Sequence, residues 1–118
     1  MNAIRGGGNA PSIATRLAWL LAIALQGGVA CAADAVAGRR KAASCVACHG
    51  EAGLSVLPNA PHLAGQPAIY VAEQMRQFRS GRRPSEVMGV IAKPLTDPDI
   101  DDLAAWYEAI RIDAKPPS

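Results

Sequence analysis

Large aromatic side chains are scarce in this sequence of 118 residues, which has two tryptophans, two tyrosines and one phenylalanine. Long apolar runs are also missing. Residues 17–25 form an unbroken apolar run of only nine, whereas a membrane-spanning helix needs roughly 20 residues. No segment alternates apolar and polar residues over the length of a strand, which argues against a β-sheet. With so little aromatic bulk for a core, we expect something other than side chains to fill the centre of the domain.

Acidic residues are absent from residues 1–32, whereas two arginines lie within that segment. The order of a basic segment, a short apolar run and an Ala-x-Ala site at residues 30–32 is typical of a secretory signal peptide. We therefore expect residues 1–32 to be an export signal and residues 33–118 to form the functional domain. An uncleaved membrane anchor and a lipoprotein acylated at Cys31 are the alternatives.

The expected domain has no excess of either charge. The whole chain has 12 basic and 10 acidic residues, and removal of the signal leaves ten of each. A neutral domain does not indicate a nucleic-acid partner. The cleavage would also leave two cysteines, Cys45 and Cys48, so that no odd thiol remains. A domain of about 86 residues often depends on a metal, a disulfide or a cofactor for its stability.

Three segments are predicted to be helices, at residues 35–48, 67–80 and 98–112. Asp34 is the expected N-cap of the first and Asp97 is a cap candidate for the third. Gly81 is the expected end of the second helix. The connecting stretches 50–66 and 81–94 are rich in glycine and proline and are predicted to be loops. The sequence thus predicts a small all-α domain whose long loops surround a cofactor.

The motif Cys45-Val-Ala-Cys48-His49 carries the strongest chemical signal. In a helical turn the two thiols lie on one face, where they can add to the two vinyl groups of a haem while His49 reaches the iron. This spacing is a c-type haem attachment motif, and it predicts one haem c held by two thioether bonds. A thioredoxin-like thiol pair, a Cys45–Cys48 disulfide, and a zinc site completed by His62 are the alternatives. The first lacks a βαβ pattern and the zinc site lacks a second ligand pair of the usual spacing.

A haem iron bound by one histidine leaves a second axial position, for which Met75, Met88 and His62 are candidates. Met75 lies in the apolar stripe of the second helix, where a methionine is more often part of the core. Met88 lies in the predicted loop 81–94, and a soft thioether ligand raises the reduction potential. We expect Met88 to be the ligand, with His62 or an open site as alternatives.

A ligand histidine usually donates its second ring N–H to a carboxylate or a carbonyl group. Pro61 could offer its backbone carbonyl to His49, since proline has no N–H of its own and can only accept there. The alternative for Pro61 is a simple turn former.

The ordered set of motifs resembles class I cytochromes c of the bacterial c553 and c4 type. The resemblance covers residues 35–110 and rests on five segments: the attachment motif, Pro61-His-Leu-Ala-Gly65-Gln66, Phe78-Arg-Ser-Gly81, Met88-Gly-Val-Ile-Ala92 and Leu103-Ala-Ala-Trp106-Tyr107. It implies a small cytochrome c fold with about three main helices around one covalently attached haem. A c4 protein carries two haems, and this chain has one attachment motif.

The resemblance also implies roles for individual residues. Cys45 and Cys48 would form the thioether bonds, His49 and Met88 would bind the iron, and Pro61 would orient His49. The first and last helices would cross, with residues 38 and 42 facing residues 103 and 106.

The predicted function is that of a periplasmic one-electron carrier and not of an enzyme. Its donor and acceptor proteins would dock transiently, as weak redox partners do, and no stable membrane insertion is expected after signal cleavage. Four arginines could form a basic docking patch or an ordinary solvated face: Arg76, Arg79, Arg82 and Arg83. Alternative functions are an electron-transfer subunit of a dehydrogenase or oxidase, and a haem peroxidase or gas-binding protein, against which Met88 argues.

Overall fold

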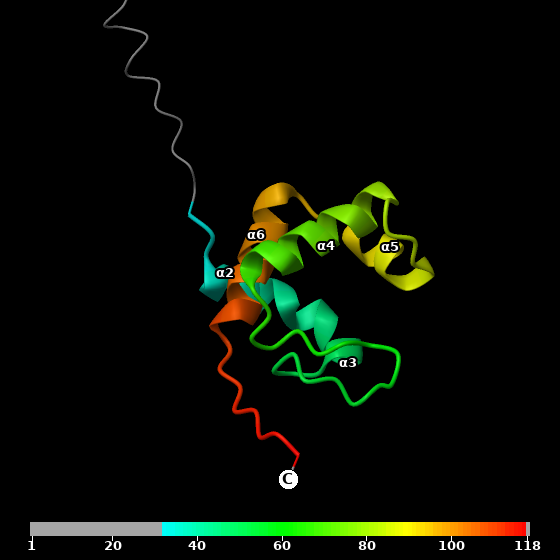
Figure 1. The fold of residues 1–118 in the computed structure, drawn as a ribbon. Coiled ribbons are helices and arrows are strands. Elements are labelled where there is room, and N and C mark those ends of the chain that lie inside the picture. The colour runs from blue at the N-terminus through cyan, green and yellow to red at the C-terminus, as the bar shows by residue number, and fades with distance from the viewer. Residues whose placement is uncertain (1–31, 118) are drawn as a thin grey trace, which may run out of the picture. The chain divides into compact units, whose positions relative to one another are not determined.

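The computed structural model describes residues 32–117, which form helices and loops without a β-strand (Figure 1). In chain order the elements are α2 (Ala35–Lys41), the 3-10 helix η1 (Ala42–Cys45), α3 (Val46–His49), α4 (Ala68–Ser80), α5 (Glu86–Ala92) and α6 (Asp97–Ala109). The prediction of an all-α domain is confirmed for this part of the chain. The expected export signal, apart from its last residue, lies outside the described residues. No helix within 32–117 has the length and apolar character needed to cross a membrane.

The first predicted helix is a continuous helical path in three parts. Asp34 is its N-cap, as expected, because its carboxylate accepts hydrogen bonds from the backbone N–H groups of Val36 and Ala37. At Ala42 the path tightens into η1 and then returns to α-helical geometry in α3. Consequently the attachment motif is not part of one regular helix, since Cys45 ends η1 and the rest of the motif forms α3.

Helix α4 matches its predicted bounds closely. Pro67 is its N-cap residue, so the helix begins at Ala68, one residue later than predicted. Gly81 ends the helix in a left-handed conformation (φ 79°), and its N–H donates to the carbonyl of Phe78. The predicted glycine stop is therefore confirmed.

Helix α6 begins one residue earlier and ends three residues earlier than predicted. Its cap is Thr96 and not Asp97, because the Thr96 hydroxyl accepts the N–H of Asp99 while the Asp99 carboxylate accepts the N–H of Thr96. This reciprocal pair is a capping box, in which an aspartate takes the position of the usual glutamate or glutamine. Asp97 instead occupies the first turn, where a negative charge complements the helix dipole.

The prediction of one loop over residues 81–94 is wrong, because this stretch contains helix α5. Ser85 caps the helix by accepting the backbone N–H of Met88. Pro84 precedes that cap and Gly89 lies inside the helix. Both residues usually indicate a loop, and for this reason the sequence pattern did not predict the short helix. Met88 accordingly lies on a helix and not in a loop.

Helix α6 is the element on which the others pack. Against α4 it buries one cluster made of Val71, Ala72, Ile100 and Ala104. Against η1 it buries a second cluster made of Ala42, Leu103 and Tyr107. Figure 1 shows α2 and α4 both lying against α6, with α5 beyond the end of α4. Three of these seven buried residues are alanines and one is aromatic, so the helices pack closely with little side-chain bulk between them.

Helices α2 and α6 cross at Gly38, as expected from the family resemblance. A methyl group on Gly38 would lie 1.9 Å from the backbone oxygen of Asp102 and 2.8 Å from Cβ of Trp106. Such distances are far below van der Waals contact, so only glycine allows this approach.

Ion pairs at the edge of the α2–α6 crossing stabilise it further. The ammonium group of Lys41 forms ion pairs with Asp99 (2.8 Å) and Asp102 (2.6 Å). The backbone N–H of Asp34 donates to the other oxygen of Asp102 at 2.7 Å. Lys41 and the cap Thr96 lower the pKa of Asp99 well below its ordinary value, and the bonds from Asp34 and Lys41 lower that of Asp102. Both carboxylates are therefore ionised in the folded domain at any pH near neutral.

Substitution of Gly38 by alanine tests how closely the domain depends on this crossing. We expect Gly38→Ala to lower the free energy of unfolding by about 1–3 kcal/mol or more, because the helices must separate to admit the methyl group. Denaturant unfolding followed by circular dichroism measures the change. Arg40→Ala, at an exposed position of the same helix, is the matched control and should change stability by less than about 0.5 kcal/mol. Equal stabilities for Gly38→Ala and the wild type would contradict the account.

Candidate functional site

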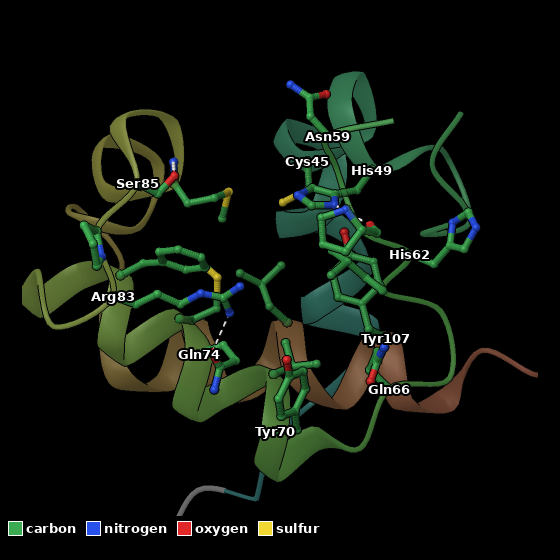
Figure 2. Close-up of a pocket in the computed structure, with 18 residues that line it drawn as sticks. Cys45, His49, Asn59, His62, Gln66, Tyr70, Gln74, Arg83, Ser85 and Tyr107 are labelled. Carbon is green, nitrogen blue, oxygen red and sulfur yellow. Dashed lines mark hydrogen bonds between the residues drawn. The ribbon is translucent and has the colours of Figure 1, made fainter. Parts of the chain in front are cut away.

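A cavity of about 370 Å³ opens between the attachment motif on one side and helices α4 and α5 on the other (Figure 2). Loop residues between α3 and α4 complete the first wall, and side chains of α6 lie at the base. The 18 lining residues are Cys45, His49, Asn59, Pro61, His62, Leu63, Gln66, Tyr70, Val71, Gln74, Met75, Phe78, Arg83, Pro84, Ser85, Met88, Leu103 and Tyr107. Four of the five predicted site residues are in this set, and Cys48 is not.

His49 is held in one orientation on the first wall. Its side chain is buried, and its Nδ1 atom lies 2.9 Å from the carbonyl oxygen of Pro61. A carbonyl can only accept, so Nδ1 must carry the proton in this hydrogen bond. The neutral imidazole then has its lone pair on Nε2, which is the form needed for a metal ligand.

The two cysteines of the motif are free thiols in the structure. Cys45, the last residue of η1, is half-buried and lines the cavity, whereas Cys48 is exposed on α3. The structure therefore does not contain the Cys45–Cys48 disulfide considered above. Both sulfurs remain available for a bond to a ligand.

The second wall supplies a methionine sulfur. Met88 lines the cavity from α5 and is half-buried. Met75 also lines it, but it packs at the same time against the buried cluster between α4 and α6, as expected for a core methionine. His62 is exposed, and Figure 2 shows its ring directed away from the cavity centre, unlike that of His49.

A buried serine that the sequence analysis missed shapes the turn after the motif. The Ser55 hydroxyl donates to the carbonyl of Cys48 at 2.8 Å and accepts the N–H of Leu57 at 2.9 Å. Ser55 thereby ties the end of α3 to the loop that returns toward His49. A serine in a loop gives no local signal of such a role, because the contact joins positions seven residues apart.

Tyr107 supports the base of the site from α6. It is buried, and burial together with the nearby Cys45 raises its pKa above the ordinary value. Its ring also packs against Gly53, where an added methyl group would come within 3.0 Å of the ring and within 2.9 Å of the N–H of Ala64. The Gly53 carbonyl accepts the N–H groups of Leu63 and Ala64. After the proline, the N–H of Gly65 donates to the carbonyl of Tyr107 at 2.8 Å, so the loop contacts α6 on both sides of Pro61.

The residues of the alternative zinc site do not come together in the described part of the chain. Within residues 32–117, no three side chains of histidine, cysteine, aspartate or glutamate come together as a metal-binding group. His62, the residue that would have completed such a site with Cys45, Cys48 and His49, points elsewhere.

The chemistry of the cavity fits a haem c. Its walls are mostly apolar, which suits a porphyrin. A neutral imidazole on one wall and a thioether on the other are the donor pair of high-potential haem iron. Two free thiols adjacent to the histidine supply the atoms for covalent attachment. The haem would supply a one-electron iron couple, and the protein would supply ligands, orientation and a shielded environment.

A family model described as cytochrome c matches residues 35–109 of the chain. Cytochrome c4 of Pseudomonas aeruginosa is 43% identical over 88 residues, which are 75% of this chain and 44% of that protein. A protein named thiosulfate dehydrogenase electron acceptor, from Thiomonas intermedia, is 40% identical over 100 residues, covering 82% of this chain and 46% of that one. The chain thus spans about half the length of these curated relatives.

Two further comparisons bear on size and fold. Cytochrome c-554(548) of Halomonas halodenitrificans is 41% identical over 81 residues, which are 66% of this chain and 98% of that protein. The crystal structure of reduced recombinant cytochrome c4 from Pseudomonas stutzeri superposes with a TM-score of 0.64 at 37% identity. It covers 68% of this chain and 47% of its own. The similarity therefore extends to a relative of single-domain length.

Removal of the Ser55 hydroxyl tests the turn that carries the site. We expect Ser55→Ala to lower the free energy of unfolding by about 1–3 kcal/mol, because the buried hydroxyl that links the Cys48 carbonyl to the Leu57 N–H is lost. Ser80→Ala is the matched control: its hydroxyl donates to the carbonyl of Gln77 on an exposed helix end, and we expect a change below about 0.5 kcal/mol. Denaturant unfolding of both variants provides the comparison, and equal losses would refute the role given to Ser55.

Proposed function

Because the chain belongs to the cytochrome c family, we propose that it is a periplasmic carrier of one electron with a single haem bound at Cys45, Cys48, His49 and Met88. The family membership means that the protein carries covalently bound haem c and transfers electrons instead of catalysing a reaction on a substrate. The observation that best supports the proposed site is the hydrogen bond from His49 to Pro61, which presents an oriented imidazole to a mostly apolar cavity.

His49 is the proposed proximal ligand. Its hydrogen bond to Pro61 keeps the proton on Nδ1 and leaves the lone pair of Nε2 free to bind the iron. The bond also prevents the ring from turning, so that the histidine has the same orientation in both redox states. Rapid electron transfer is favoured when the ligands move little between the two redox states. Pro61 contributes to this by orienting His49.

Cys45 and Cys48 are the proposed attachment sites for the two thioether bonds. They lie three residues apart on consecutive short helical segments, so both sulfurs are close to the imidazole that follows them. Covalent attachment would compensate for the small core of this domain, because a tightly held cofactor stabilises the folded state. The proposed single haem follows from the single attachment motif.

Met88 is the proposed distal ligand. It stands on the wall opposite His49, and helix α5, capped by Ser85, holds its backbone in place. Met75 is engaged in the core and His62 is exposed, so neither is positioned as well for the iron. A thioether favours the reduced iron, which would give the protein a relatively high potential.

The proposed domain begins at residue 33 after an export signal at 1–32. The family match starts at residue 35, where α2 also starts. Relatives of the chain are bacterial c-type cytochromes, and thioether formation in an exported protein suits the periplasm. Donor and acceptor proteins would then be other periplasmic or membrane-attached redox proteins that dock transiently.

A second candidate is a dedicated electron acceptor of one dehydrogenase, as a component of its complex. The similarity to proteins named thiosulfate dehydrogenase electron acceptor favours this possibility. Purification at moderate salt separates the two functions, since a free carrier elutes alone whereas a subunit elutes with its enzyme.

Two volume-conserving substitutions test the axial ligand. We expect Met88→Leu to lose the weak ferric absorption band that accompanies methionine–haem ligation and to lower the reduction potential, because leucine has no sulfur. Met75→Leu is the matched control, with the same change at a core position, and should keep both properties. Absorption spectra and potentiometric titration of the matured holoproteins provide the data. Retention of the band in Met88→Leu, or its loss in Met75→Leu, would overturn the assignment of Met88.

A further inference from the structure

The cavity is almost free of charge. Among its 18 lining residues, Arg83 is the only lysine or arginine, and the set contains neither aspartate nor glutamate. A haem brings two carboxylate groups, which are ionised at neutral pH. A carboxylate that enters an apolar site is costly unless it meets a cation or hydrogen-bond donors. Among the lining side chains, Arg83 is therefore the one that carries a permanent positive charge to neutralise such a group.

The structure holds the Arg83 side chain over the cavity. Its guanidinium carbon lies 4.6 Å from the centre of the Phe78 ring, a cation–π contact. One of its terminal nitrogens donates to the side-chain oxygen of Gln74. Figure 2 shows the guanidinium group directed inward from the α4–α5 connection, toward Gln74. The Phe78 ring and the Gln74 amide thus fix the orientation of the Arg83 guanidinium group.

Most of the donor capacity of Arg83 is unused within the described part of the chain. A guanidinium group has five N–H donors, and the hydrogen bond to Gln74 uses one of them. Residues 32–117 provide no carboxylate partner for Arg83. A planar fork with adjacent free donors is suited to binding a carboxylate through two parallel hydrogen bonds.

The three neighbouring arginines are different because each already has an acidic partner. Arg76 pairs with Asp97 and Asp101, Arg79 pairs with Asp97, and Arg82 pairs with Glu73. Arg79 also donates to the carbonyl of Leu95. The contacts of Arg76 and Arg79 connect α4 to the start of α6, and that of Arg82 ties the α4–α5 connection back to α4. The four arginines are therefore not a uniform basic patch, and Arg83 stands apart by its position and by its free donors.

We propose that Arg83 is a positioning residue that binds one carboxylate group of the haem, with Phe78 and Gln74 holding the guanidinium in place. This inference rests on the proposed haem site and adds a residue to it. A fixed positive charge beside the haem makes the additional charge of the ferric state less favourable. Arg83 therefore raises the reduction potential, in the same direction as a methionine ligand.

Arg83→Gln tests the proposal, with Arg82→Gln as the matched control. Both variants remove one arginine charge at adjacent positions, but Arg82 does not line the cavity. The matured holoproteins are compared by potentiometric titration at low ionic strength and by resonance Raman spectroscopy of the haem carboxylate bending modes. We expect Arg83→Gln to lower the potential and displace a bending mode, with the methionine–haem absorption band retained. Arg82→Gln should leave the bending modes unchanged and shift the potential much less.

Arg83→Lys is a second test. It takes the place of Arg83→Gln if that variant yields too little holoprotein. Lysine keeps the charge but lacks the planar fork, so the bending mode should move while the potential stays near that of the wild type. Bending modes unchanged in whichever Arg83 variants mature, or equal shifts in potential for Arg82→Gln and Arg83→Gln, would overturn the proposal. A wild-type protein without covalent haem would instead overturn the proposed function, so the two failures are distinguishable.

Discussion

The close crossing of α2 and α6 at Gly38 is the constraint on which the rest of the domain depends. The crossing brings the backbone of α6 into contact with α2. The ion pairs of Lys41 with Asp99 and Asp102 stabilise this contact at its edge. Since η1 and α3 continue directly from α2, this crossing also places the attachment motif beside Tyr107 on α6. The site is thereby positioned by a close backbone contact outside the cavity, which leaves the cavity itself free for a cofactor.

The site then follows from how the loop after α3 is pinned. Ser55 donates to the carbonyl of Cys48 at the end of α3. The Gly53 carbonyl accepts hydrogen bonds from two N–H groups that follow Pro61, and the Pro61 carbonyl accepts one from the Nδ1–H of His49. On the opposite wall, α5 carries Met88. Each wall therefore belongs to a different part of the core: the motif and its loop depend on the α2–α6 contact, whereas α5 follows α4. Electron transfer with little rearrangement requires both walls to stay in place, which is what these contacts provide.

Much of this arrangement could be predicted from the sequence because its signals are local. The cap at Asp34, the stop at Gly81 and the attachment motif depend on residues within a few positions of one another. Helix α5 was missed because it has only seven residues and one of them, Gly89, is a residue that usually indicates a loop. The cap of α6 was assigned to the wrong residue because Thr96 and Asp99 form the cap together. The roles of Ser55 and Arg83 could not be predicted, since each depends on contacts that exist only after the chain has folded.

The central claim is that one haem is attached covalently at the Cys-x-x-Cys-His motif. Mass spectrometry of the protein exported by a host with cytochrome c maturation tests it most directly. The account predicts an intact mass equal to the mature chain plus one haem, with the added mass in the tryptic peptide of residues 42–76, which contains both Cys45 and Cys48. A chain of unmodified mass, or a haem that acidic organic solvent extracts from the protein, would contradict it.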